Sequence, residues 1–395
     1  MSLRFLTAGE SHGPCLTAIL EGMPAGLPLR PEDVNQDMRR RQKAYGAGGR
    51  MKIERDVVTF TGGVMAAHTT GGPIAIRIEN RDWKNWAQRE IPPLTVPRPG
   101  HADLTAAVKY GYRELRLALE RASARETAAR VAVGAVCKRF LSQFGIRVQA
   151  YVTEIGGVVA HIPEDMPYET RFELAETNDV RCPDAEAVSQ MHERIRECME
   201  AKDTLGGVFE VVALGVPPGL GSHVQYDRRL SGRLMGAVGS IHAIKGVEIG
   251  HGFANAHKRG TEVHDEIFLD GRKLVRRTNR AGGLEGGISN GMPIVVRAAM
   301  KPIATTLTPL HSVDLATGQP AATCYERSDF CAVPRAAVVG EAMVAFVLAD
   351  ALLEKLGGDS LDEMRPRFAA LRRLMLDDLP MDNGSWRFGY DTPPE

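Results

Sequence analysis

The chain has 395 residues, enough for two or three average domains or one large duplicated domain. Its composition is that of an ordinary globular protein, with 44% hydrophobic and 25% charged residues. The 49 basic side chains balance the 49 acidic ones, which argues against a general binder of nucleic acid or of membrane surfaces.

The six cysteines form no C-x-x-C pair and no disulfide-framework spacing. We therefore expect reduced thiols and no metal site. The first residues lack the apolar core of a signal peptide, and the most apolar run, residues 342–349, is much shorter than the roughly 20 residues of a membrane helix. These features predict a cytoplasmic protein with no membrane contact.

Two apolar runs, residues 3–8 and 15–20, predict strands that meet at Gly9-Glu10-Ser11-His12-Gly13. A serine and a histidine between glycines are typical of groups presented to a ligand, because glycine lets the backbone turn sharply and approach closely. A simple turn whose polar side chains cap the backbone stays open as an alternative. After it, the pattern predicts a helix from Pro31 to Arg41 and strands over residues 51–60 and 74–78.

Farther along, we expect Asp103 to cap a helix that starts at Leu104. Ser123 and Glu126 have capping-box spacing for a helix through about residue 141, and its apolar residues on most sides predict a buried central helix. Residues 161–183 read as irregular. The other expected elements are strands over 148–155, 209–214 and 245–250, helices over 185–202, 334–356 and 361–376, and a hairpin at Asp270-Gly271.

Two stretches of the chain recur about 200 residues later in the same order. Residues 215–220 echo residues 22–27, and residues 290–296 echo residues 71–76. This order predicts a duplicated unit, with halves 1–200 and 201–358 followed by a C-terminal helix and tail over 359–395. Coincidence stays open, because turns of glycine and proline are common.

Several groups of residues fit an anionic ligand, because arginine binds phosphate bidentately and a helix N-terminus offers unpaired N–H groups. An arginine run is also typical of a solvated helix face. The glycine-dense residues 281–287 can lie flat against a planar ligand, although their spacing is not a dinucleotide fingerprint. The anion-binding candidates are His12 and His101, Arg39, Arg40 and Arg41 with Arg50, the segment 121–125, and Arg327-Ser328-Asp329.

Six motifs carry a family resemblance. They are Gly9–Gly13 with Gly22-Met23-Pro24, residues 98–103 (RPGHAD), 120–127 (ERASARET), 245–250 (KGVEIG), 301–305 (KPIAT), and Arg327-Ser328-Asp329 with residues 340–343 (GEAM). Together they resemble the chorismate synthase family over residues 3 to about 358. The resemblance implies an α+β fold, a β-α-β sandwich of two similar halves with antiparallel sheets around central helices, usually assembled as a homotetramer.

The resemblance also implies a lyase of the shikimate pathway, which serves aromatic amino acid biosynthesis. Its substrate would be 5-enolpyruvylshikimate 3-phosphate, which loses phosphate by anti-1,4-elimination to give chorismate. The reaction is redox-neutral but requires reduced FMN. No nucleotide fingerprint is visible in the sequence, so we expect external reduction of the flavin, with NADPH as an indirect reductant.

By the same resemblance, His12 would assist phosphate departure and His101 would protonate or stabilise the reduced flavin. Asp329 would lie near flavin N5 in a proton relay, supported by Ser11. The implied flavin contacts are Arg121, Ala122, Ser123, His242, Ala243, Gly286, Lys301, Pro302, Ile303, Ala304, Thr305 and Arg327, and the implied contacts to the substrate phosphate are Arg41 and Arg50.

Three positions depart from the family pattern. Many relatives carry arginine where this chain has Ala47, an amide is common at the position of His242, and smaller residues are usual at Phe330. The competing hypothesis is a catalytically silent protein of the same fold that binds phosphate, or binds RNA through the arginine run.

Overall fold

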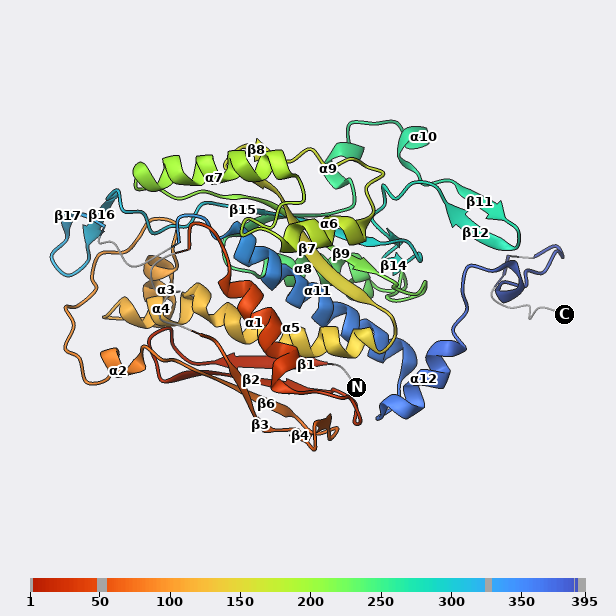
Figure 1. The fold of residues 1–395 in the computed structure, drawn as a ribbon, viewed down its shortest axis with the longest axis horizontal. Helices are drawn as coiled ribbons and strands as arrows, with labels where there is room; N and C mark the ends of the chain where they lie inside the picture. The colour runs from red at the N-terminus through yellow and green to blue at the C-terminus, as the bar shows by residue number, and fades with distance from the viewer. Residues whose placement is uncertain (1–2, 48–54, 324–328, 387, 390–395) are drawn as a thin grey trace.

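The computed structural model describes residues 3–47, 55–323, 329–386 and 388–389. Helices and strands both contribute to its core, which confirms the mixed helix and strand content of the predicted class. Figure 1 shows helices between two sheets, with the first sheet below them and the second above.

The first sheet has four antiparallel strands in the order β1-β2-β6-β3. Alternate residues of its inner strands, such as Leu16 and Leu20 on β2 and Ile74 and Ile78 on β6, are buried, so one face of this sheet covers the core. Its strands are β1 (Arg4–Ala8), β2 (Cys15–Glu21), β3 (Val58–Gly62) and β6 (Ile74–Glu79), and β4 (Val64–Met65) pairs with β5 (His68–Thr69) beside it.

The second sheet has five strands in the order β10-β15-β9-β7-β8, again antiparallel. Strand β9 lies in its centre, and four of its eight residues are buried while none is exposed. The strands are β7 (Arg147–Ile155), β8 (Val158–Val159), β9 (Gly207–Leu214), β10 (Ile244–Ile249) and β15 (Ile294–Met300).

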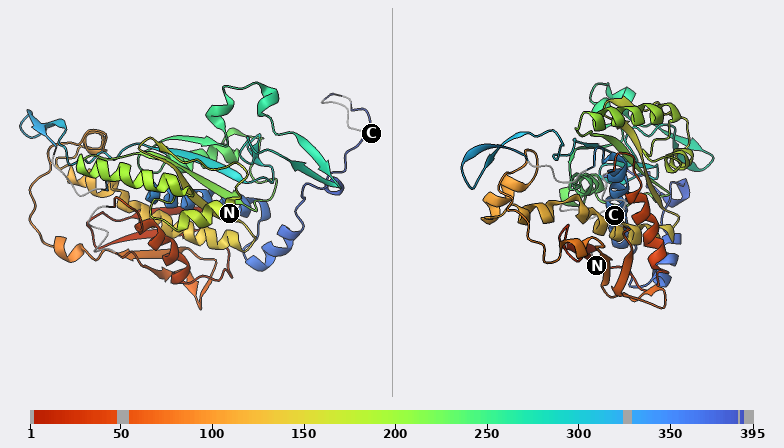
Figure 2. Two further views of the ribbon diagram at one scale, coloured as in Figure 1. Left: turned by 45° about the horizontal axis from the view of Figure 1, so that its top comes forward. Right: turned by 60° about the vertical axis from the view of Figure 1, so that its left-hand side comes forward.

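Helices α5 (Thr127–Ser142) and α11 (Val333–Leu356) pack against each other between the sheets, as Figures 1 and 2 show. The contact is close because a Cβ on Gly134 would stand only 2.2 Å from the Cβ of Ala342. Helix α5 is the predicted buried central helix. Helix α11 is long and apolar enough to cross a membrane, but 89% of its most apolar window is buried inside the protein, which is typical of a core helix.

Helix α1 (Pro31–Gln42) lies beside α5, and α8 (Leu230–Gly239) packs with α11 on the second sheet. Helix α7 (Ala185–Glu200) covers β8. The prediction of irregular structure over 161–183 is wrong, because helix α6 (Tyr168–Glu176) forms there and packs on β7. The helix buries Arg171, Phe172 and Ala175. Because one of these buried residues is charged, the sequence shows no clear helical periodicity of apolar residues here.

Three other boundaries differ from the sequence prediction. The strand expected over 51–60 begins at Val58, and residues 51–54 lie outside the described residues. The helix expected over 361–376 is α12 (Leu361–Ala369), which ends seven residues early. Asp103 does not cap: it is the first residue of α3 (Asp103–Tyr110), and its carboxylate binds side chains instead.

The predicted hairpin at Asp270-Gly271 is confirmed as β11 and β12, which form an arm with the C-terminal segment. Another hairpin, β16–β17, projects from the opposite end of the molecule (Figure 1). The remaining elements are α2 (Trp83–Trp86), α4 (Arg116–Ala122), η2 (Ala124–Glu126), η3 (Tyr226–Arg228), α9 (Gly252–Asn255), α10 (Gly260–Val263), β11 (Ile267–Asp270), β12 (Lys273–Arg276), β13 (Leu284–Glu285), β14 (Ile288–Ser289), β16 (His311–Asp314), β17 (Gln319–Ala322) and η4 (Leu376–Asp378).

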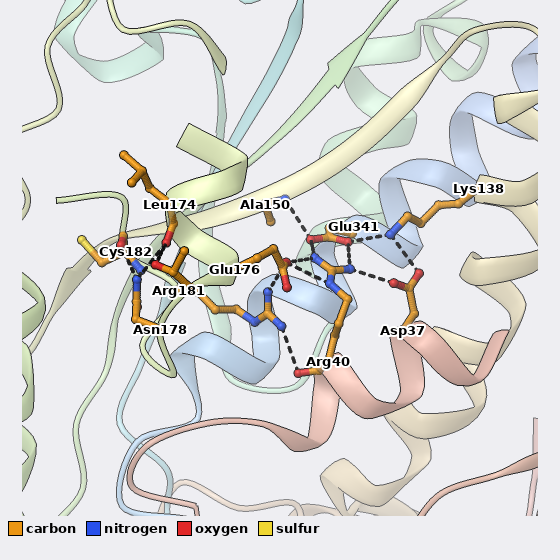
Figure 3. A network of polar contacts seen from close by, with 11 residues as sticks. Asp37, Arg40, Lys138, Ala150, Leu174, Glu176, Asn178, Arg181, Cys182 and Glu341 are labelled. Carbon is orange, nitrogen blue, oxygen red and sulfur yellow. Dashed lines mark hydrogen bonds and ion pairs between the residues drawn. The ribbon is translucent and has the colours of Figure 1, made fainter. Parts of the chain in front are cut away.

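A buried network of charges joins α1, α5 and α11 (Figure 3). The Glu341 carboxylate accepts two hydrogen bonds from Arg40, at 2.6 and 2.7 Å, and one from Lys138 at 2.8 Å. Burial raises the pKa of Glu341, but the charges of Arg40 and Lys138 outweigh burial and hold the pKa well below its usual range. The network therefore anchors the C-terminal turn of α1, in which Arg41 directly follows Arg40.

Candidate functional site

The segment 120–127 runs from the end of α4 through η2 to the first residue of α5, and it contacts Ser11, His12 and Arg41. Ser123 is extended there and caps η2, because its hydroxyl accepts a hydrogen bond from the N–H of Arg125 at 3.3 Å. This cap redirects the chain into α5. Before this turn, the Glu120 side chain contacts His12, and after it the Ala124 backbone oxygen contacts Arg41.

His12 lies in the turn between β1 and β2. The turn is tight because Gly9 has a φ of 109°, and a Cβ there would stand 2.4 Å from the carbonyl oxygen of Cys15. The Nδ1 atom of His12 is 2.7 Å from Glu120 Oε1, and the backbone N–H of His12 donates to Glu120 Oε2 at 2.7 Å. On another side, the His12 ring packs on the Trp86 ring with centroids 4.0 Å apart.

Glu120 is ionised in this setting. Burial raises the pKa of its carboxyl, but the hydrogen bonds from the side chain and backbone of His12 outweigh burial and lower the pKa. Neighbouring Ser11 is buried, and its hydroxyl accepts a hydrogen bond from Ser123 at 3.1 Å. Ser11, His12 and Ser123 therefore lie close together.

Arg41 is buried at the end of α1. It donates to Thr127 Oγ1 at 3.1 Å, to the carbonyl oxygen of Ala124 at 3.2 Å and to Asp56 at 3.3 Å. Burial and the nearby charge of Arg335 lower the pKa of Arg41 to about 9, against the opposing effect of Asp56. The guanidinium is therefore still charged at neutral pH.

Asp329 lies just before α11 and forms a short ion pair with Arg335. The Nε of Arg335 also donates to the backbone oxygen of Arg41 at 3.2 Å. Arg335 thus connects Asp329 with the end of α1. Through Arg41 and Ala124, this group is continuous with the segment that holds Ser11 and His12.

His101 lies in the loop before α3. Its Nδ1 is 2.6 Å from Asp103, whose carboxylate has no exposed surface. Arg98 donates to the same carboxylate from Nε at 2.8 Å and Nη2 at 3.0 Å, and its Nη1 donates to Thr305 at 3.1 Å. Burial raises the pKa of Asp103, but the bonds from His101 and Arg98 outweigh burial and hold it well below its usual range.

The loop after β15 carries the predicted contacts Lys301 to Thr305. Lys301 Nζ donates to the backbone oxygen of Gly100 at 3.2 Å, and its N–H donates to the oxygen of Ala243 at 2.9 Å. Ala243 has a φ of 64°, an uncommon conformation for a residue with a side chain. The loop therefore joins the His101 segment to the segment of His242 and Ala243. The other predicted contacts in this loop after β15 are Pro302, Ile303 and Ala304.

An open cavity of about 430 Å³ lies between β1, the segment 120–130 and His242. The Nδ1 atom of His242 is buried with no hydrogen-bond partner among the described residues. Burial lowers the pKa of His242. The positive charges of Arg130 and Arg121 lower this pKa further, whereas the negative charge of Glu126 raises it. The lowering effects prevail, so the ring is neutral at pH 7. The lining residues are Phe5, Leu6, Thr7, Arg121, Glu126, Arg130, Ser240, His242 and Met343.

Comparison with known proteins places this site in a family. The family model described as chorismate synthase matches residues 3–353. The chain belongs to the chorismate synthase family. Chorismate synthase of Syntrophotalea carbinolica is 56% identical over 378 residues, covering 93% of this chain and 97% of that protein. Chorismate synthase of Aquifex aeolicus is 55% identical over 383 residues, covering 93% and 96%.

A solved structure agrees with the family assignment. The chain is similar to a crystal structure of chorismate synthase with a TM-score of 0.77 and 48% sequence identity, and the match covers 93% of this chain and 97% of that one. The resemblance that the six motifs predict is therefore confirmed over nearly the whole chain.

Some residues expected from the chorismate synthase resemblance do not join this cluster. Gly286 lies in the β13–β14 turn, where a Cβ would meet only the His223 side chain, 3.9 Å away, among the described residues. Arg50 and Arg327 lie outside the described residues. Phe330, one of the departures from the family pattern, donates its N–H to the oxygen of Gly46 at 2.9 Å, and its own oxygen accepts the N–H of Leu205 at 2.8 Å.

The arginine run offers no exposed basic surface of the kind an RNA binder needs. Arg40 is held by Glu341 and Glu176, and Arg41 is buried, so two of the three arginines point into the protein. The solvated helix face, the other alternative for this run, applies only to Arg39. The comparisons likewise give no support to a silent phosphate or RNA binder.

Sequence reasoning missed the partners of the two histidines. Glu120 and Asp103 stand inside the motifs ERASARET and RPGHAD, yet neither was assigned to a histidine. Trp86 and Arg98 were also missed. The sequence did offer one signal, because Asp103 stands in the same motif as His101. Glu120 stands in a different motif from His12, and their pairing across 108 residues depends on the fold.

Proposed function

We propose that this chain catalyses the reaction of its family, the conversion of 5-enolpyruvylshikimate 3-phosphate to chorismate. The C–O bond to phosphate breaks and phosphate leaves with the electron pair of that bond, while C6 loses a proton. A new C=C bond forms and the reaction has no net redox change. The observation that carries the proposal is the family match over residues 3–353, within which both predicted histidines are bound by carboxylates.

Reduced FMN is the proposed cofactor, and the residues around the cavity fit such a group. The buried Nδ1 of neutral His242, which has no partner in the part of the chain that the structure describes, offers a hydrogen bond, and Arg121 lies at the same cavity. When bound, a reduced flavin supplies electron density to the allylic system and recovers it. Arg121, Ala122, Ser123, His242, Ala243 and residues 301–305 are the proposed contacts in this cluster. Gly286, which lies apart from the cluster, and Arg327, which is outside the described residues, are proposed from the family resemblance alone. An external source of reducing equivalents, such as NADPH, is proposed to reduce the flavin.

His12 is the proposed acid at the leaving group. A protonated imidazole can give its Nε2 proton to a phosphate oxygen as the C–O bond breaks, a contribution typically worth about 10²–10⁴-fold in rate. Arg41 is the proposed phosphate contact, together with Arg50. Three of the five N–H donors of Arg41 bind described protein oxygens, which leaves two for phosphate.

The proposed proton acceptor relay involves Asp329, supported by Ser11, and His101 is proposed to stabilise the reduced flavin. Support for this division comes from geometry. His101 lies against the loop that carries Thr305, through Arg98, whereas His12 lies against Ser11 and Glu120. The two histidines thus belong to neighbouring but different parts of the site.

We also propose that the fold arose by duplication into a sandwich of two similar halves. The order β1-β2-β6-β3 in the first sheet matches the order β7-β9-β15-β10 in the second, and helices α5 and α11 follow in corresponding places. This correspondence supports a boundary near Arg147, earlier than the residue 201 expected from the sequence. A cytoplasmic homotetramer is the proposed assembly, by analogy with the family.

An anaerobic assay tests the proposed activity. The protein is mixed with chemically reduced FMN and 5-enolpyruvylshikimate 3-phosphate, and the absorbance of chorismate is followed. We expect chorismate and phosphate in equal amounts. Absence of chorismate under these conditions would contradict the proposal. Formation of chorismate with only NADPH and oxidised FMN would instead show that the chain reduces its own flavin.

A further inference from the structure

Glu120 makes three contacts with the turn that holds His12. Its Oε1 lies 2.7 Å from His12 Nδ1, its Oε2 accepts the His12 backbone N–H at 2.7 Å, and its backbone oxygen accepts the N–H of Ser11 at 3.1 Å. One residue of α4 therefore fixes both the backbone and the ring of the histidine. The His12 and Glu120 side chains are only 16% and 14% exposed, so water competes little for these bonds.

Trp86 supports the ring from another side. Its ring lies at a centroid distance of 4.0 Å from the imidazole with an interplanar angle of 36°. The indole N–H donates to Asp82 at 3.0 Å, and Arg89 lies 5.5 Å from the indole centroid. Trp86 is thereby held in place, and it limits rotation of His12 about its side-chain bonds.

The chemistry of Glu120 determines which ring nitrogen carries the proton. An ionised carboxylate has only acceptor atoms, so the nitrogen that faces it must be an N–H. The neutral imidazole of His12 therefore has its proton on Nδ1. Proton transfer to or from a ligand must then use Nε2, and after giving up that proton the ring returns to the tautomer that Glu120 already stabilises.

We propose that Glu120 is a positioning residue that holds His12 in the Nδ1–H tautomer and directs Nε2 toward the leaving phosphate. This inference rests on the proposed role of His12 in the reaction. It deepens that role, because it says why one particular carboxylate is required at the start of the ERASARET motif. Glutamine cannot replace it: an amide offers one acceptor and one donor, whereas His12 presents two N–H groups.

The first test uses the unaltered protein. The full chain is labelled with ¹⁵N-histidine, and the His12 ring signals are identified by their loss in His12→Asn. In the neutral form of the ring, we expect the proton on Nδ1. A ring with its proton on Nε2 would overturn the inference without any need for a Glu120 variant.

The second test compares Glu120→Gln with Glu21→Gln, a matched change at an exposed glutamate of β2 that pairs with Arg4 on β1. We expect Glu120→Gln to shift the His12 tautomer and to lower kcat about 10- to 100-fold, the usual scale for an outer partner of a functional histidine, with a smaller change in KM. Glu21→Gln should change neither. A Glu120→Gln protein with the normal tautomer and normal kcat would overturn the inference.

The failures of the two proposals are distinguishable. If the unaltered protein makes no chorismate, the proposed function fails, and the tautomer measurement still tests the geometry. If His12→Asn makes chorismate at the normal rate, the role of His12 fails, and with it the claim that Glu120 serves catalysis. A purely structural role for Glu120 would lower stability without moving the tautomer or the pH profile of kcat, and would also overturn the inference.

Discussion

Both histidines of the proposed site bind a carboxylate through Nδ1, at 2.7 Å in the pair His12–Glu120 and at 2.6 Å in the pair His101–Asp103. The carboxylates differ in their other partners. Glu120 binds the ring and backbone of the same histidine, whereas Asp103 has no exposed surface and also accepts two side-chain bonds and one backbone bond from Arg98.

This difference separates two functions of a carboxylate. Glu120 has its strongest contacts with His12, so its charge acts mainly on that histidine. The charge of Asp103 is largely matched by Arg98, whose Nη2 lies 3.0 Å from the His101 ring. We therefore expect Glu120 to serve the chemistry of His12, and Asp103 to serve both the fold and the orientation of His101.

Removal of His12 should have the largest effect on activity. His12→Ala is expected to lower kcat for chorismate formation by about 10²–10⁴-fold, because the leaving phosphate loses its proton donor. Anaerobic kinetics with reduced FMN measure the change, and thermal unfolding serves as the control for folding. A kcat within a few fold of the normal value would remove His12 from the mechanism.

Asp103→Asn should disrupt the His101–Asp103 pair and lower the free energy of unfolding. The amide leaves the buried Arg98 guanidinium without a counter-charge, a change that typically costs about 3–5 kcal/mol. Glu120→Gln should cost less, because Glu120 is closer to solvent and its loss strands no buried arginine. Urea unfolding of the two variants measures the difference in the free energy of unfolding. Equal losses would contradict the distinction between the pairs.

The pH dependence of stability should also show the contribution of the Asp103 carboxylate to the fold. The folded-state pKa of Asp103 lies below its unfolded-state value, so its stabilising contribution is complete above the unfolded pKa of about 4 and declines as the pH falls below it. Asp103→Asn removes this contribution. The variant should therefore show a shallower loss of stability below about pH 4 than the unaltered protein, as measured by urea unfolding over a pH series. Parallel curves would argue against an ionised Asp103.

Replacement of Trp86 should have the smallest effect. Trp86→Phe keeps an aromatic ring near His12 but loses the indole N–H bond to Asp82. Aromatic pairs contribute about 0.5–1.5 kcal/mol, so we expect a decrease in kcat of about 2- to 10-fold. Steady-state kinetics measure it, with Trp83→Phe on the same short helix as a matched control. No decrease would mean that Glu120 alone holds the ring.

The sequence was sufficient where the signal was local. The periodicity of the apolar residues predicted α5 and α11, and the glycines of Gly9–Gly13 indicated the close approach that Gly9 makes. The family followed from six motifs. Where the local pattern was weak, helix α6 was missed altogether. The end of α12 was placed seven residues too late.

Partner choice could not be predicted, because it depends on packing. Asp103 looks like a helix cap by position, but Arg98 and His101 approach it from the preceding loop and compete for its oxygens. The arginine run looked like one group, yet α1 directs Arg40 toward Glu341 and Arg41 toward Asp56, because successive residues on a helix face different directions. The distance from His12 to Glu120 is set by the fold.

The proposed roles place His12 at the substrate phosphate and His101 at the flavin. The most direct measurement is the affinity for FMN, in the presence of substrate, of the unaltered protein, His12→Ala and His101→Ala. We predict that His101→Ala weakens FMN binding about tenfold or more, equivalent to about 1.4 kcal/mol, whereas His12→Ala stays within about twofold. Equal weakening by both variants, or weakening by His12→Ala alone, would contradict the account.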